Sequence, residues 1–237
     1  MSKETALLDI WGDYAFFRRG YTTTSPLTYP FPTRTALSGL ISAILGLERD
    51  SYYDTFSERN SAFALQIISP IRKIRIKQNL IDTNTGFYLW NNKGQRAQIP
   101  FEYIKEPKYR VYVSLEGKLF DRLVSLLKEH ESVYTPYLGI SECIANFRYI
   151  GTFEANEQNT DGREMEISSL IPNDKATRIK LEAGKRYGKI TVPGFMDKTR
   201  VVRKFLSFIY EENGKTIEIT RGKFFQIKGS DTNVIFF

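Results

Sequence analysis

Helical periodicity of apolar residues is clearest between residues 34 and 46, directly after a loop rich in threonine, serine and proline. Pro30 and Pro32 restrict the backbone upstream of this segment. Thr33 is a suitable N-cap, and Gly46 stands where a C-terminal glycine cap belongs. The pattern predicts a capped helix with one apolar side and one slim side. The apolar positions are Leu37, Leu40, Ile41, Ile44 and Leu45, and the small ones are Ala36, Gly39 and Ala43.

Apolar runs and alternating patterns predict four strands and two helices in the first 150 residues. Pro70 lies inside the second strand and predicts an edge position, a bulge or a break there. The order strand-helix-strand-strand-helix-strand is that of an α+β, ferredoxin-like or RRM-like domain, in which both helices cover one face of the sheet. The predicted strands are 6–17, 62–77, 108–115 and 142–153, and the predicted helices are 34–46 and 117–131.

Residues 78–107 interrupt this pattern. They contain several asparagines and glycines, with aromatic residues on both sides and with Asn92 and Gly94 near the middle. We expect a long, exposed, hairpin-like excursion between the second and third strands.

The last third of the chain is predicted to be mainly β. Residues 154–163 are polar and acid-rich, which is typical of a linker, so we divide the chain into domains 1–153 and 154–237. The second part is either a smaller β-rich domain or an extension packed on the first. Asn213-Gly214 is a hairpin turn signal. The predicted strands are 164–171, 178–182, 187–193, 200–210, 215–221, 223–228 and 232–237.

Composition indicates a folded, soluble protein. The chain has 237 residues, 41% of them hydrophobic, and its apolar runs are too short to span a membrane. We find no secretory signal, and a single cysteine excludes an internal disulfide, so a cytoplasmic location without a membrane partner is expected. With one histidine and one cysteine, the chain lacks a Cys/His zinc site, and it has no glycine-rich phosphate loop. We therefore assign no catalytic residue, metal or cofactor.

The excess of positive charge is concentrated in one segment. The net charge is +7, and residues 71–110 hold nine basic residues against three acidic ones, nearly the whole surplus. A basic segment of this kind favours a nucleic-acid partner. The basic residues are Arg72, Lys73, Arg75, Lys77, Lys93, Arg96, Lys105, Lys108 and Arg110.

The start of the first predicted helix is a candidate phosphate site, because free N–H groups and the positive end of the helix dipole attract anions. Arg18 and Arg19, at the exit of the first strand, are expected to join Thr33 and Arg34 there. The alternative is an ordinary capped core helix with surface salt bridges. Trp11 and Phe16 are predicted to be core residues.

Other candidate nucleic-acid contacts come from three places. On the second predicted strand, Lys73, Arg75 and Lys77 share one face. This face either contacts successive phosphates of a bound nucleic acid or is a solvated edge. The excursion wedges between nucleotides or packs on a neighbouring subunit, unless it is a mobile polar loop. Tyr21 and Tyr137 stack on bases or pack internally, and Gly139 allows close approach of a nucleic acid or makes a tight turn. The excursion residues concerned are Asn91, Asn92, Lys93 and Arg96, with Lys105 and Lys108 at its return.

The question whether the chain is an enzyme depends mainly on His130, its only histidine. Metal-independent RNA cleavage needs a general base and a general acid. His130 lies between Glu129 and Glu131 at a predicted helix end, where the dipole favours its cation, so a stabilising surface role is expected. Lysine and tyrosine residues can still form a site without it, so RNA cleavage stays open as an alternative.

The first strand, the run 30–46, and the loop Pro136-Tyr137-Leu138-Gly139 with Ser141 and Glu142 resemble the CRISPR-associated Cas5 family of RAMP proteins. The type I-B branch is the most similar. The resemblance covers residues 6–46 and 134–150 best, and the last third agrees in length and β-rich character only.

The resemblance implies a ferredoxin-like RAMP domain with a protruding thumb, here about 78–107. It further implies a non-catalytic subunit of a type I Cascade complex in antiviral defence, which binds the 5′ handle of the crRNA. The implied partners are the backbone RAMP subunit, the large subunit and, indirectly, target DNA. A related type I-C branch cuts RNA itself, so an endoribonuclease that processes CRISPR transcripts is one alternative. A subunit that only bridges proteins is another.

Overall fold

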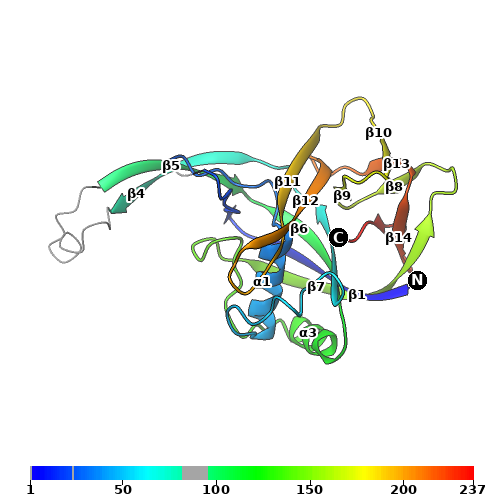
Figure 1. Cartoon of the computed structure of the whole chain (residues 1–237), viewed down its shortest axis with the longest axis horizontal. Coiled ribbons are helices and arrows are strands. Elements are labelled where there is room, and N and C mark those ends of the chain that lie inside the picture. The colour runs from blue at the N-terminus through cyan, green and yellow to red at the C-terminus, as the bar shows by residue number, and fades with distance from the viewer. Residues whose placement is uncertain (1, 23, 82–95) are drawn as a thin grey trace.

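The computed structural model describes residues 2–22, 24–81 and 96–237, and this part of the chain is mostly β with two described helices (Figure 1). Its largest sheet has the strand order β15-β14-β7-β1-β6-β3. Neighbouring strands of this sheet are antiparallel. The bounds are β1 (Ser2–Trp11), β3 (Ser61–Ile67), β6 (Lys108–Leu115), β7 (Asn146–Asn159), β14 (Lys223–Ile227) and β15 (Asn233–Val234).

Two amphipathic helices cover one face of this sheet. They are α1 (Arg34–Leu45) and α3 (Lys118–Glu129), and the prediction of both is confirmed. Thr33 caps α1, because its hydroxyl accepts a hydrogen bond from the Ala36 N–H at 3.2 Å. Gly46 ends α1 at φ 73°. Neither helix in the described part of the chain has the length and hydropathy that crossing a lipid bilayer requires.

Residues of β1 alternate between two apolar layers. Leu8 and Ile10 lie in the main core with the helices, whereas Leu7 belongs to a smaller cluster with Tyr112 on the opposite face of the sheet. Phe16 is buried in the main core, as predicted. The prediction is wrong for Trp11, which is half-buried and lies outside the apolar clusters of the described residues. The reason is the alternation of side chains along β1, which places Trp11 with Leu7 on the face of the sheet that the helices do not cover.

A long arm leaves the body of the molecule (Figure 1). It consists of β4 (Lys73–Ile81) and β5 (Arg96–Lys105), which pair from Lys73↔Ile104 to Ile81↔Arg96. Short strand β2 (Tyr14–Ala15) pairs with the base of the arm, where Phe16 packs on Phe101 and Tyr103. The break expected at Pro70 separates β3 from β4.

The predicted linker at 154–163 is wrong, because β7 continues to Asn159 and pairs with β14. The strands of the last third therefore extend the main sheet as well as forming two small sheets. Asn213-Gly214 makes a turn but not a hairpin, since the strands on either side of it lie in different sheets. The remaining strands are β8 (Met165–Ile167), β9 (Ile171–Pro172), β10 (Arg178–Lys180), β11 (Tyr187–Met196), β12 (Val202–Glu211) and β13 (Ile217–Arg221).

Candidate nucleic-acid interface

A groove runs along the exposed side of α1, beginning at its N-terminus. The helix contributes small side chains here, since the apolar positions of α1 face the core. The part beside the helix start encloses about 380 Å³ and continues along Ala36, Gly39 and Ala43. We call it the α1 groove. Its lining includes Arg18, Thr33, Thr35, Ala36, Gly39, Tyr52, Tyr137, Gly139, Met196 and Arg200.

The two arginines predicted to lie at the end of the first strand have different surroundings. Arg18 is exposed and lines the α1 groove, and no carboxylate of the described residues forms an ion pair with it. Arg19 is held by the loop that follows: its Nε donates to the Thr28 carbonyl at 3.0 Å, and its guanidinium lies 5.5 Å from the Tyr29 ring centre. Tyr21 is 72% exposed beside Arg19. Of the two guanidinium groups, that of Arg18 is therefore the freer to contact an anion.

The role predicted for Arg34 is wrong, because its guanidinium is buried inside the protein with 1% of the residue exposed. Nη1 donates to the Phe237 carbonyl at 2.7 Å, and Nη2 donates to the hydroxyl of Ser61 at 2.7 Å and to the carbonyl of Phe56 at 3.2 Å. Burial lowers the pKa of Arg34 to about 10, so the side chain stays protonated at neutral pH. This arginine anchors the helix start to distant segments and does not offer its charge to a ligand.

The loop that contains Tyr137 and Gly139 forms the opposite wall of the α1 groove. Tyr137 is 47% exposed, which leaves its ring free to stack on a ligand. Gly139 has φ 98°, and a Cβ there would lie 2.0 Å from the carbonyl oxygen of Phe16. The glycine is thus required by close packing on Phe16, directly after β2, and its place in the lining of the groove follows from that packing.

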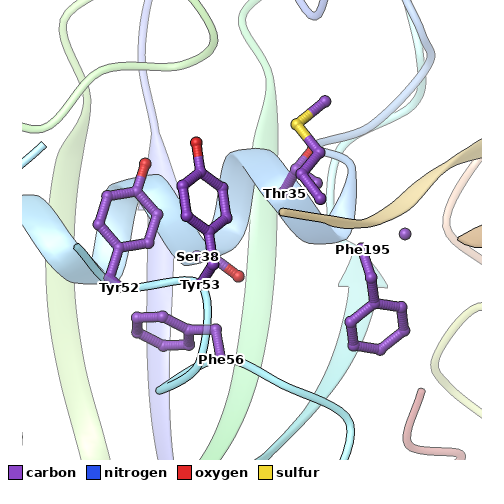
Figure 2. Close-up of a pocket in the computed structure, with 8 residues that line it drawn as sticks. Thr35, Ser38, Tyr52, Tyr53, Phe56 and Phe195 are labelled. Carbon is purple, nitrogen blue, oxygen red and sulfur yellow. The ribbon is translucent and has the colours of Figure 1, made fainter. Parts of the chain in front are cut away.

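Two tyrosines that sequence reasoning did not select stand beside α1. Tyr52 and Tyr53 stack on each other with ring centres 5.3 Å apart. Figure 2 shows their hydroxyls pointing in the same direction, with Phe56 on the opposite side, in a pocket that adjoins the α1 groove. Burial raises the pKa of Tyr52 and of Tyr53, so both hydroxyls stay neutral donors. Two adjacent tyrosines after the helix were the only signal in the sequence.

A segment from the last third of the chain closes one side of this pocket. Residues 193–204, the outer part of the β11–β12 hairpin, are called the strap. Ion pairs join it to the turn after α1: Arg200 binds Asp50 through two bonds of 3.0 Å, and Lys198 lies 3.5 Å from Asp54. Lys204 binds Glu58 at 2.7 Å. No sequence signal connects segments so far apart.

The arm presents the alternating pattern that the sequence predicted. Lys73, Arg75 and Lys77 are exposed on β4, while Ile74 and Ile76 are half-buried. Lys73 pairs with Glu102 at 3.0 Å, whereas Arg75 and Lys77 have no ion-pair partner among the described residues. Of the other predicted contacts, Arg96 and Lys105 are exposed on β5, and Lys108 is half-buried at the start of β6. Asn91, Asn92 and Lys93 lie outside the described residues.

The chain contains one histidine, His130, and one cysteine, Cys143. His130 adopts φ 56° as the C-cap of α3, and its ring lies 4.7 Å from that of Phe147. Burial raises the pKa of the Cys143 thiol to about 11, which keeps it protonated. Among the residues that the structure describes, no three His, Cys, Asp or Glu side chains are grouped so that they could hold a metal ion.

Comparisons with known proteins give a consistent result. The model of the family described as CRISPR-associated protein (Cas_Cas5) matches residues 5–187. Among curated proteins, no sequence matches the chain.

Three solved structures resemble the fold at low sequence identity. A CRISPR protein from Archaeoglobus fulgidus has 12% identity and a TM-score of 0.58, with 98% of each chain covered. A chain of a CRISPR RNA-guided surveillance complex has 14% identity and a TM-score of 0.51, with 90% of this chain and 91% of that chain covered. A chain of a type III-B Cmr-beta complex bound to cognate target RNA and AMPPnP has 11% identity and a TM-score of 0.50, with coverage of 90% and 86%.

Proposed function

Since the chain belongs to the CRISPR-associated Cas5 family, we propose that it is a non-catalytic subunit of a type I, I-B-like Cascade complex that binds the 5′ handle of the crRNA. The observation that carries the proposal is the α1 groove. It combines the N-terminal end of α1, the exposed cation Arg18, which has no ion-pair partner among the described residues, and exposed aromatic surface at Tyr137. Single-stranded RNA is bound by this combination of positive charge and stacking platforms.

The arrangement of the main sheet supports the ferredoxin-like reading of the first domain. Strands β7-β1-β6-β3 are neighbours, α1 lies between β1 and β3 in the chain, and α3 lies between β6 and β7. The β4–β5 arm is inserted between β3 and β6, where the resemblance places a thumb. In our proposal the arm contacts the crRNA through Arg75 and Lys77 and packs on the backbone RAMP subunit.

The proposed partners follow from this role. The subunit holds the leading end of the guide, lies beside the first backbone RAMP subunit and contacts the large subunit, so it meets target DNA indirectly. Among the similar folds, one chain comes from a complex described as RNA-guided and another from a complex bound to target RNA. This supports a place in a multi-subunit, RNA-containing particle.

Reconstitution of the full chain with its partner subunits and guide RNA tests the proposal. Cross-linking is expected to join handle nucleotides to residues of the α1 groove, and the double variant R18Q/Y137A is expected to reduce these cross-links. The variant K175Q/Y134A changes the same residue classes at exposed positions outside the groove and serves as control. Handle cross-links that avoid the groove would overturn the proposal.

The two alternatives are separated in the same preparation. Specific cleavage of repeat RNA by the purified chain in the presence of a chelator would favour the endoribonuclease. Particles that assemble normally with no cross-link from the chain to RNA would favour a subunit that only bridges proteins.

A further inference from the structure

The face of the main sheet that the helices leave uncovered carries a second group of basic residues. In the pairing register, Asp9 of β1 stands opposite Arg110 of β6 and Arg148 of β7. Two residues along, Trp11 stands opposite Lys108. Directly opposite residues in antiparallel strands project their side chains from the same face. We call Trp11, Lys108, Arg110 and Arg148 the β1 platform.

A buried carboxylate holds the two arginines of the platform. Asp9 is 1% exposed; its Oδ1 accepts from Arg110 Nε at 2.7 Å, and its Oδ2 accepts from Arg148 Nη2 at 3.3 Å. The side chains of Arg110 and Arg148 nevertheless remain 30% and 63% exposed. Arginines restrained in this way lose less rotamer freedom when they bind an anion.

The charges of the platform are not balanced within the described ranges. One carboxylate, Asp9, faces two guanidinium groups, and the Lys108 ammonium has no carboxylate within ion-pair distance among the residues described. Trp11 adds a half-buried ring outside the apolar clusters of those residues. Surplus positive charge next to an indole is suited to a phosphate backbone with an unstacked base.

We propose that the β1 platform binds a single-stranded nucleic acid, with Arg110, Arg148 and Lys108 on backbone phosphates and Trp11 stacked on a base. A protein partner fits less well, because interface centres are apolar and the other polar neighbours here, Asn146 and Gln66, offer no such centre. Single strands are favoured over duplexes, since only an unpaired base presents its face to an indole.

This site is separate from the α1 groove. The helices pack on the face of the sheet that carries Leu8 and Ile10, whereas Asp9 and Trp11 belong to the other face. A strand bound in the groove therefore leaves the platform open. The platform serves a second stretch of nucleic acid, either further along the same strand or on another strand.

The test uses the full chain and fluorescein-labelled oligouridylate and oligothymidylate in a salt series. Since each lost phosphate contact removes about 0.7 unit of salt slope for a single strand, K108Q/R148Q should lower the slope by about 1.4 and the low-salt affinity about tenfold. The control R163Q/K175Q removes the same charge from exposed positions in the last third of the chain and should change the slope little. Arg110 is left intact, because its loss would strand the buried Asp9 carboxylate.

Fluorescence of Trp11 gives an independent readout, because the chain has two tryptophans and W90F leaves Trp11 alone. Oligonucleotide binding should quench Trp11, and R18Q/Y137A in the groove should leave that quenching in place. Unchanged salt slope in K108Q/R148Q, or absence of quenching in W90F, would overturn the platform whatever becomes of the groove. Capture of an acidic protein that depends on Arg148, with oligonucleotide binding unaffected, would overturn it as well. The RNA and DNA arms identify which strand binds more tightly.

Discussion

Arg200 and Asp50 form a two-bond ion pair, with both N–O distances 3.0 Å, across 150 positions of the sequence. Both residues have positive φ, 62° and 64°, so two turns adopt a backbone conformation that non-glycine residues rarely take. The pair fastens the strap to the turn after α1. It also means that a cation lining the α1 groove is neutralised by an acid lining the same groove.

Replacing Asp50 with asparagine should strengthen RNA binding. D50N releases Arg200 and adds one net positive charge to the α1 groove, so low-salt affinity rises and the salt slope steepens by about one. Fluorescence anisotropy with handle RNA measures both. The control E58Q breaks the Lys204 pair, also on the strap, at a residue outside the groove lining. Weaker binding by D50N than by E58Q would contradict this role for the pair.

The Arg200–Asp50 ion pair should be lost only at acidic pH. The hydrogen bonds from Arg200 and then Tyr53 hold the pKa of Asp50 below its ordinary value. A carboxylate whose pKa is lowered by folding contributes stability above its unfolded pKa, roughly 4, and that contribution vanishes as the pH falls through the folded pKa. The Arg200 Nε–H resonance should therefore be unchanged from neutral pH to about 5 and shift below about 4. A shift near neutral pH would show that another group controls the strap.

Arg34 should matter for stability more than for RNA binding. R34M leaves the carbonyls of Phe56 and Phe237 without their donor, and unsatisfied buried acceptors make the expected loss on the order of 3 kcal/mol. Urea unfolding measures it. R18Q, at an exposed site, should change stability by less than about 0.5 kcal/mol. Equal stability of R34M and wild type would refute the structural role.

Gly139 and Gly162 form a matched pair for a backbone test. Both have positive φ, but a Cβ would meet the Phe16 carbonyl at Gly139 and nothing within 4 Å at Gly162. G162A should cost only the left-handed conformation, about 1 kcal/mol, and G139A should cost clearly more. Thermal unfolding compares them. Equal losses of unfolding free energy in the two variants would mean that the loop can move away from Phe16 without a free-energy cost.

On the arm, Arg75 and Lys77 have no ion-pair partner among the described residues. They should contribute more to guide binding than Lys73, which pairs with Glu102. R75Q and K77Q remove charges without a described partner, so each should reduce the salt slope of guide binding by about one. K73Q removes a lysine already matched by Glu102 and should have a smaller effect. Guide affinity in the assembled particle, measured across a salt series, distinguishes the three. A larger effect from K73Q would indicate that Glu102 does not compensate it.

Local signals predicted most of the elements. The proline-rich loop, the Thr33 cap and the Gly46 cap delimit α1 in the sequence as they do in the structure. The alternation of Lys73 to Lys77 likewise gave the exposed face of β4. These features depend on residues that are close in the chain, so pattern and structure agree.

The failures involve partners that are distant in the sequence. The acid-rich segment after residue 153 looked like a linker, yet Glu154 and Glu157 pair with Lys228 and Lys223 across the β7–β14 ladder. The segment has the polar, acid-rich composition of a linker. It forms a strand because lysines of the neighbouring segment neutralise its acidic residues. Arg34 and Arg200 were misjudged or missed for the same reason, since their partners are supplied by remote segments.

The bond from Arg34 to the Phe237 carbonyl sets an order of events during synthesis, because 203 positions separate the two residues. When α1 has emerged from the ribosome, the Phe237 carbonyl that accepts from its Arg34 guanidinium has not yet been translated. This hydrogen bond can therefore form only after residue 237 has been translated, whereas the Thr33 cap at the same helix end needs only residues that are close in the chain.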